Sequence, residues 1–223
     1  MRMPGLIGTS LAALSLIVAL PLMRAHSESA AVKLDPPAVD AAPAEGLQTA
    51  VIAGGCFWGV QAVFQHVKGV VSATSGYAGG TVDSPSYDEV STGTTGHAES
   101  VRVVFDTSQV SLGQLLKVFF SVAHDPTELN RQGPDVGTQY RSAVFYTTEA
   151  QRKVVDAYIA QLTKAKAFKD PIVTQVAPLK AFYEAEGYHQ NYYNLHPNQP
   201  YIVINDRPKV EALKTQFAQL WRD

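Results

Sequence analysis

The chain has 223 residues, of which 46% are hydrophobic, so it is long enough to bury the core of one ordinary domain. Its 18 basic and 20 acidic side chains give a net charge of −2 without a basic stripe, which argues against nucleic acid as a partner. Because it contains a single cysteine, it can form no intrachain disulfide.

The N-terminus has the composition of a targeting segment. Arg2 precedes an apolar run, and Ala25 follows it, so we predict a secretory signal peptide over residues 1–25. A retained N-terminal membrane anchor is the alternative, although polar residues leave the run at the short edge for a membrane span. We therefore expect an exported, periplasmic protein. Residues 26–46 are rich in Ala, Pro and acidic side chains, which predicts a flexible linker.

Residues 47–223 are expected to form one folded domain, which opens with a strand, a helix and a second strand. A buried strand is predicted over residues 48–53 and ends at a Gly-Gly pair. Apolar side chains at helical spacing then predict a helix; they are Phe57, Val60, Val63, Phe64 and Val67. The second strand is predicted over residues 70–77.

The middle of the domain alternates loops with regular elements. A polar loop is expected over residues 83–96, followed by a strand over residues 98–105. Ser111 is placed to cap the next helix, whose apolar face includes Leu115 and Phe119. Residues 124–139, which are polar and contain Gly and Pro, predict a second long loop. Long loops of this kind in a compact domain usually carry function.

The last part of the chain continues this alternation. A strand is predicted over residues 140–146, and Thr148 with Gln151 fits a capping box at the start of a helix. A fifth strand is predicted over residues 172–177, and Asp206 with Pro208 begins a final helix through Leu220. The order βαββαβ predicts an α/β (α+β) fold: a two-layer sandwich with a ferredoxin-like core and a C-terminal extension.

Cys56 is the first candidate catalytic residue, since it lies where the first strand meets the first helix. The preceding glycines permit a tight turn, and the positive end of the helix dipole favours the thiolate. A buried, inert cysteine is the alternative, which the Gly-Gly turn and the helix start disfavour. Phe57 and Trp58 point about a quarter-turn apart, so at least one of them is expected to line a pocket at the thiol.

Glu99 is the second candidate. In the strand over residues 98–105 it shares a face with Val101, Val103 and Phe105, so its carboxyl group should be desolvated, and its pKa should rise. Such a group is a neutral acid that can donate a proton. A charge that reaches solvent at the strand edge is an equal alternative on position alone.

The remaining polar side chains are less informative. Tyr87 and Tyr140 lie at loop or strand starts, where position alone favours core rings with satisfied hydroxyls. The histidines lack the spacing of a metal site, so no metal is expected. A phosphatase is excluded because Ala62 stands where a phosphate-binding arginine would be needed.

Four motifs in order resemble the peptide methionine sulfoxide reductase A family. They are Gly-Cys-Phe-Trp-Gly at 55–59, Thr-Gly-His-Ala-Glu at 95–99, Gly-Thr-Gln-Tyr-Arg-Ser at 137–142 and Tyr-His-Gln at 188–190. The resemblance spans residues 50–209. It implies an enzyme that reduces the S epimer of methionine sulfoxide, free or in proteins, and forms a sulfenic acid on its cysteine.

The resemblance also implies roles for individual residues. Cys56 would attack the sulfoxide sulfur, and Glu99 would protonate its oxygen. Tyr87 and Tyr140 would donate hydrogen bonds to that oxygen, and Phe57 and Trp58 would hold the methyl group. Asp135 and Tyr192 would help to bind the substrate.

One feature departs from the family pattern, in which many members carry resolving cysteines near the C-terminus. Here residues 198–203 contain none. The resemblance therefore implies an external thiol reductant, such as a thioredoxin-like protein, and no cofactor. We also expect the protein to be a monomer. A one-cysteine peroxidase and a module that binds oxidised methionine without turnover are the alternative functions.

Overall fold

A computed structural model describes residues 31–41 and 46–223. In this part of the chain, a mixed sheet of six strands has the order β7-β6-β1-β3-β2-β8. Its strands are β1 (Leu47–Gly54), β2 (Val70–Ala78), β3 (Ala98–Asp106), β6 (Ser142–Tyr146), β7 (Gln175–Pro178) and β8 (Phe182–Glu184). A separate two-stranded ribbon pairs β4 (Arg131–Gln132) with β5 (Asp135–Val136).

Helices connect the strands and cover one face of the sheet. The α-helices are α1 (Phe57–Gln65), α2 (Tyr87–Ser91), α3 (Leu112–Val118), α4 (Glu149–Lys164), α5 (Tyr192–Leu195) and α6 (Arg207–Gln216). Two π-helical turns span Phe119–Ala123 and Ile202–Asp206, and two 3₁₀ turns span Thr138–Tyr140 and Gly187–His189. No helix of the described residues is long and apolar enough to cross a membrane.

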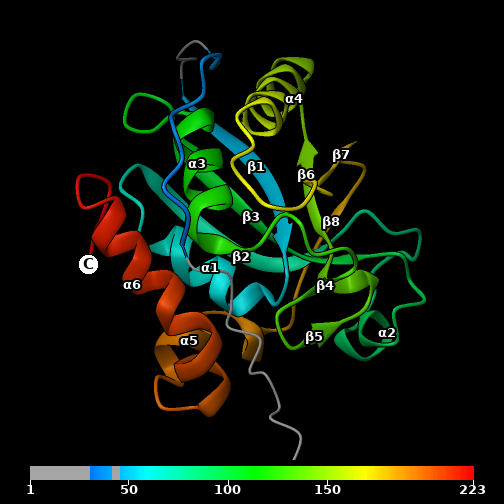
Figure 1. Ribbon diagram of the computed structural model, residues 1–223. Helices are drawn as coiled ribbons and strands as arrows, with labels where there is room; N and C mark the ends of the chain where they lie inside the picture. Colours follow the sequence, from blue (N-terminus) through cyan, green and yellow to red (C-terminus); the bar gives the residue numbers. More distant parts are fainter. Residues whose placement is uncertain (1–30, 42–45) are drawn as a thin grey trace, which may run out of the picture.

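The ferredoxin-like core predicted from the sequence is confirmed. The strands β6, β1, β3 and β2 lie in this order with antiparallel pairing throughout, and α1 and α3 are the two crossover helices. Figure 1 shows α1 and α3 in front of β1 and β3. After this core, α4 leads to β7, which pairs parallel to β6 and adds a further βαβ unit.

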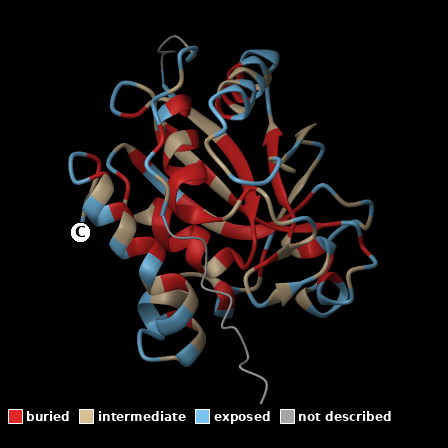
Figure 2. Ribbon diagram, in the orientation of Figure 1, coloured by how far each residue is buried: buried red, intermediate tan, exposed pale blue. Residues whose placement is uncertain are grey.

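Residue alternation along the strands separates two apolar clusters. Ala50 and Ile52 of β1 face the helices, whereas Val51 and Ala53 join a smaller cluster on the other face with Phe145. Figure 2 shows that the buried residues concentrate in the central strands and in α1 and α3. The helix-facing side of the sheet therefore holds the main core. The carboxyl end of β1 lies at the edge of this core.

Several predicted elements differ in extent from the observed ones. The polar loop over residues 83–96 contains α2, because Ser86 and Glu89 form a complete capping box. The strand predicted from residue 140 begins at Ser142, since Tyr140 belongs to a 3₁₀ turn, and the strand predicted over 172–177 is β7, displaced toward the C-terminus. The final helix ends at Gln216 rather than Leu220, and β4, β5 and β8 were not predicted.

The sequence predicts caps for two other helices. One of these caps is complete, and the other is formed only in part. Ser111 and Gln114 form a complete capping box at α3. At α4, Thr148 accepts a hydrogen bond from the Gln151 backbone N–H, but the Gln151 side chain accepts from Thr147 instead of closing the predicted box. That side chain also donates to a β1 carbonyl, so it ties the helix start to the sheet.

The flexible linker predicted over residues 26–46 is wrong for residues 31–41, which pack against the domain. Leu34 is 5% exposed and belongs to the main core. The Tyr158 hydroxyl donates to a backbone carbonyl of this segment, and the carboxylate of Asp40 accepts from the Gly113 backbone N–H. Apolar Val and Leu side chains among the polar ones give the segment enough buried contact to order it. The predicted signal peptide over residues 1–25 lies outside the described residues.

Candidate active site

Cys56 is the N-cap residue of α1, directly after the glycine pair that ends β1. Gly55 has a φ of +90°, a conformation that L side chains rarely adopt. A Cβ there would also lie 2.5 Å from the side chain of Gln132. The turn therefore requires glycine at this position, and it presents the thiol at the helix N-terminus, as predicted.

A cavity of about 270 Å³ opens onto Cys56. It is lined by Cys56, Phe57, Trp58, Tyr87, Glu99, Asp135, Tyr140, Gln199 and Tyr201. Seven of these nine residues were predicted site residues, and they come from α1, α2, β3, β5 and the 3₁₀ turn before β6. Tyr201 and Cys56, which are 145 positions apart in the sequence, line the same cavity. The fold thus brings distant residues together around one thiol.

Glu99 lies on the helix-facing side of β3 and is 3% exposed, so the solvent-reaching alternative is excluded. Burial raises the pKa of its carboxyl group to about 8, and the charges of Asp135 and Asp206 act in the same direction. The Phe57 backbone N–H, which donates to Glu99 Oε2 at 3.0 Å, opposes this rise. Since burial dominates, the carboxyl group is neutral at pH 7 and can donate a proton.

The Cys56 thiol is buried, and its pKa lies well above its ordinary value of 9.0. Burial is the main cause, followed by the negative charges of Glu99 and Asp206. The Trp58 backbone N–H at the helix start lowers the pKa, but this effect is smaller. The helix start thus acts on the thiol in the predicted direction, but burial of the thiol has the larger effect on its pKa.

Phe57 and Trp58 both contribute to the cavity wall, although only one of them was required to do so by the sequence argument. Phe57 is 1% exposed, whereas Trp58 is partly exposed. Tyr192 stacks on the indole of Trp58 with ring centroids 3.8 Å apart and an interplanar angle of 9°. Tyr192, which the resemblance implies helps to bind the substrate, is not among the residues that line the cavity and contacts it through Trp58.

Tyr87 and Tyr140 bring two hydroxyl groups to the cavity. Burial raises the pKa of both hydroxyls, and the charge of Glu99 raises it further. Both groups are therefore protonated at neutral pH and can donate hydrogen bonds into the cavity. The sequence position alone favoured core rings for these residues, and the structure instead brings them beside Glu99.

Tyr201 and Gln199 are lining residues that sequence reasoning missed. The Tyr201 hydroxyl donates a hydrogen bond to Asp135 Oδ2, and its ring meets Trp58 edge-on at 5.9 Å. They lie in a segment without regular apolar spacing, between α5 and a π-helical turn. The only sequence signal was an aromatic residue in a Pro- and Asn-containing loop, which is too common to identify a site.

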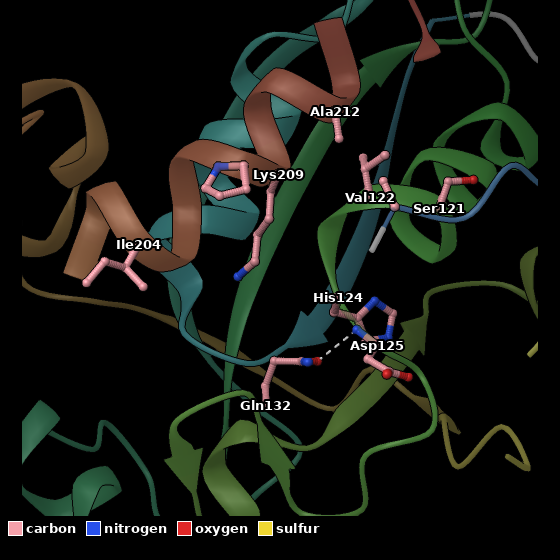
Figure 3. Close-up of a pocket in the computed structure, with 10 residues that line it drawn as sticks. Ser121, Val122, His124, Asp125, Gln132, Ile204, Lys209 and Ala212 are labelled. Atoms are coloured by element: carbon pink, nitrogen blue, oxygen red, sulfur yellow. Dashed lines mark hydrogen bonds between the residues drawn. The ribbon is translucent and has the colours of Figure 1, made fainter. Parts of the chain in front are cut away.

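A second cavity, of about 250 Å³, does not include Cys56 and is lined in part by Gln132, the residue that a Cβ on Gly55 would meet. Figure 3 shows Lys209 extending from α6 toward Gln132 and His124. The Gln132 side chain accepts a hydrogen bond from the Asp125 backbone N–H, and burial lowers the pKa of His124 to about 3. His124 does not line the Cys56 cavity, and its two ring nitrogens are hydrogen-bonded with Phe119 O and Ser142 Oγ, so it is not the partner of the thiol. Among the described residues, no cluster of His, Cys, Asp or Glu could hold a metal ion.

Comparisons with known proteins agree with this site. The family model described as peptide methionine sulfoxide reductase matches residues 48–221. The chain is 56% identical over 185 residues to peptide methionine sulfoxide reductase MsrA 2 of Mesorhizobium japonicum, covering 83% of this chain and 95% of that protein. It is 50% identical over 186 residues to the MsrA 2 protein of Synechocystis, covering 82% and 87% respectively.

Two solved structures share the fold. Methionine sulfoxide reductase A of Corynebacterium diphtheriae superposes with a TM-score of 0.60 at 37% identity, covering 70% of this chain and 78% of that chain. The reduced form of Mxr1 from Saccharomyces cerevisiae superposes with a TM-score of 0.62 at 33% identity, covering 73% and 92%. Sequence and fold thus point to the same group of proteins.

Proposed function

The chain belongs to the peptide methionine sulfoxide reductase family, and on this premise we propose how its residues carry out the reaction. The protein reduces methionine (S)-sulfoxide to methionine through a sulfenic acid on Cys56. A single observation carries the assignment of residues: one cavity holds a thiol, a neutral carboxyl group and an aromatic wall. These are the groups that reduction of a methyl sulfoxide requires.

Binding comes first. The methyl group of the substrate lies against Phe57 and Trp58, since aromatic rings accept both a methyl group and a polarisable sulfur. The sulfoxide oxygen points toward Glu99, Tyr87 and Tyr140, which are all protonated at pH 7 and donate to it. Asp135, held by the Tyr201 hydroxyl, faces the polar remainder of the substrate.

The chemical step moves oxygen from one sulfur to the other. Cys56 Sγ attacks the sulfoxide sulfur while Glu99 protonates the oxygen, which otherwise leaves poorly. The thiol proton replaces the one that Glu99 gave up. The attack forms an S–S bond to the substrate sulfur, and the protonated oxygen leaves that sulfur. The oxygen then bonds to Cys56 Sγ and the S–S bond breaks, which releases methionine and leaves the sulfenic acid, so that the substrate sulfur gains two electrons and Cys56 loses two.

The sulfenic acid is then reduced by an external thiol, because the chain contains no second cysteine. The first external sulfur displaces the hydroxyl as water and forms a mixed disulfide, and a second sulfur cleaves that disulfide to restore the Cys56 thiol. A dithiol protein of the thioredoxin kind fits this sequence of steps. No metal or organic cofactor takes part in them.

The decisive experiment is an assay of the wild type with each epimer of a blocked methionine sulfoxide, with dithiothreitol as the reductant. The cavity fixes the methyl group, the oxygen and the attacking thiol, so only the S epimer should be reduced. Comparable rates for the two epimers would contradict the proposed binding mode. A faster reaction with hydrogen peroxide than with the sulfoxide would instead favour a peroxidase.

We further propose that the protein is exported to the periplasm and acts there as a monomer that repairs oxidised proteins. The charged start and apolar run of residues 1–25 support export. N-terminal sequencing of the protein from separated cell fractions tests this proposal, since a retained anchor would leave residue 1 in place and the protein in the membrane fraction. Size-exclusion chromatography with light scattering tests the monomer.

A further inference from the structure

His189 lies directly behind the aromatic wall of the Cys56 cavity. It ends the 3₁₀ turn Gly187–His189 and is 3% exposed. Its ring centroid lies 5.1 Å from that of Phe57, 4.3 Å from that of Tyr87 and 5.8 Å from that of Trp58. These three residues line the cavity, whereas His189 does not. The histidine thus touches three of the residues proposed to bind substrate without facing the substrate itself.

The hydrogen bond between His189 and Trp58 determines the form of the imidazole. Trp58 Nε1 donates to His189 Nδ1 at 3.1 Å, and an indole N–H is a donor only. Nδ1 must therefore be the unprotonated nitrogen, and Nε2 carries the proton. Burial lowers the pKa of His189, against a smaller opposing effect of the Glu186 charge, so the neutral ring is the form present at pH 7.

The other ring nitrogen, Nε2, does not hold the ring in place through a hydrogen bond. His189 Nε2 is buried, and no hydrogen-bond partner reaches it within the described part of the chain. Leaving a buried N–H unpaired costs free energy, so the ring is not placed here to satisfy both of its nitrogens. The position of the ring instead allows Nδ1 to accept the hydrogen bond from Trp58 and allows the ring faces to contact the neighbouring aromatic rings.

The other contacts of Trp58 leave its orientation open. Tyr192 stacks on the indole face, and Tyr201 meets it edge-on. Stacking between aromatic rings is weakly directional, whereas a hydrogen bond to the ring nitrogen is directional. The bond to His189 therefore decides which edge of the indole faces the cavity.

We propose that His189 is a positioning residue that holds Trp58, and through ring contact Phe57 and Tyr87, in the arrangement that fits the methyl group of the sulfoxide. The inference rests on the proposed function, in which Phe57 and Trp58 receive that methyl group. It predicts that the acceptor at Nδ1 sets the selectivity for a methyl group over a larger substituent at sulfur.

The test compares His189→Asn with His189→Leu. The two replacement side chains have nearly the same shape, and only Asn retains an acceptor near the position of Nδ1. Each variant is assayed for kcat and KM with the S epimers of blocked methionine sulfoxide and of its S-ethyl analogue. We expect His189→Leu to lose about 10-fold in kcat/KM for the methyl substrate, the upper range for one neutral hydrogen bond, and to lose methyl-over-ethyl selectivity. His189→Asn should remain within about threefold of the wild type in both respects.

A fluorescence measurement makes the test independent of activity. The protein has two tryptophans, so Trp221→Phe leaves Trp58 as the only tryptophan, whose emission can be excited selectively over that of tyrosine. In this background, His189→Leu should shift the emission and lower the anisotropy of Trp58, and His189→Asn should not. Equal behaviour of the two variants, or unchanged selectivity in His189→Leu, would overturn the proposal. A wild type that reduces no sulfoxide would refute the proposed function, whereas the emission of Trp58 would still report on the hydrogen bond.

Discussion

The backbone N–H of Phe57 donates a hydrogen bond to Glu99 Oε2 at 3.0 Å, so the residue after the nucleophile is joined directly to the acid. Phe57 is the first residue of α1, and its N–H has no acceptor within the helix. The carboxyl group of Glu99 satisfies that donor and is held beside the start of the helix. The helix end that presents Cys56 thus also positions the proton donor.

Without a reductant, the wild type should release one methionine per chain and then stop. Cys56 is the only thiol, so its sulfenic acid has no internal partner. Rapid quenching should show the single turnover, and dimedone should label the peptide that contains Cys56. The variant Cys56→Ser should release no methionine. Repeated turnover without an added thiol would show that the recycling argument is wrong.

Replacing Glu99 by Gln should slow sulfoxide reduction by about 10²–10⁴-fold, the usual contribution of a general acid. Gln keeps an oxygen that can accept from the Phe57 N–H, so the helix start should remain intact. Steady-state rates with dithiothreitol measure the effect. The matched control is Glu184→Gln, which makes the same chemical change at an exposed carboxylate on β8 and should remain within about twofold of the wild type. Equal rates in the two variants would assign Glu99 a structural role.

The rate of reduction should fall as the pH rises through about 8. Glu99 has its pKa raised from 4.5 to about 8, so its acidic form is present below that pH and is lost above it. Because the Cys56 thiol also keeps its proton in the resting site, the reactive form carries both protons. A profile of kcat/KM between pH 6 and 10 should show this fall in the wild type and not in Glu99→Gln. A rate that still rises through pH 8 would contradict the assignment.

Alkylation of Cys56 by iodoacetamide should be slow at pH 7 and should increase with a midpoint above 9. Burial raises the pKa of the thiol, and the charge of Glu99 raises it further. In Glu99→Gln the midpoint should therefore move down, although not to that of an exposed thiol. The same chain in guanidinium chloride serves as the reference and should titrate near the ordinary thiol value of 9.0. Rapid alkylation of the folded wild type at pH 6 would show that the helix dipole outweighs burial after all.

Replacing Gly55 by Ala should destabilise the protein by about 1–3 kcal/mol, because φ at this position is +90° and the new Cβ would meet Gln132. Gly187→Ala is the matched control, since a Cβ there meets nothing within 4 Å. Thermal unfolding should show a lower Tm for the first variant only, by about 2–4 °C for each kcal/mol. A Tm equal to that of the control would mean that the turn adapts to a side chain.

The local patterns in the sequence determined the elements that carry most of the site. Alternating apolar residues placed Glu99 on the inner face of its strand, and the Gly-Gly pair placed Cys56 at the start of a helix. These features depend on residues within one turn or one strand, and sequence spacing reports such short-range relationships directly. The order of the elements was enough to predict the ferredoxin-like core, because few topologies connect βαββαβ without crossing.

Only the tertiary structure decided which distant side chains complete the cavity and what burial does to them. Tyr201 donates a hydrogen bond to Asp135 from 66 positions away, and Tyr192 stacks on Trp58 without lining the cavity. The pKa of Cys56 rises because several elements close over it, which the helix start alone could not reveal. Residues 31–41 read as a linker by composition, yet they pack on the domain. In each case the deciding free energy comes from desolvation and from packing between segments far apart in the chain. A local sequence pattern does not report on these long-range contacts.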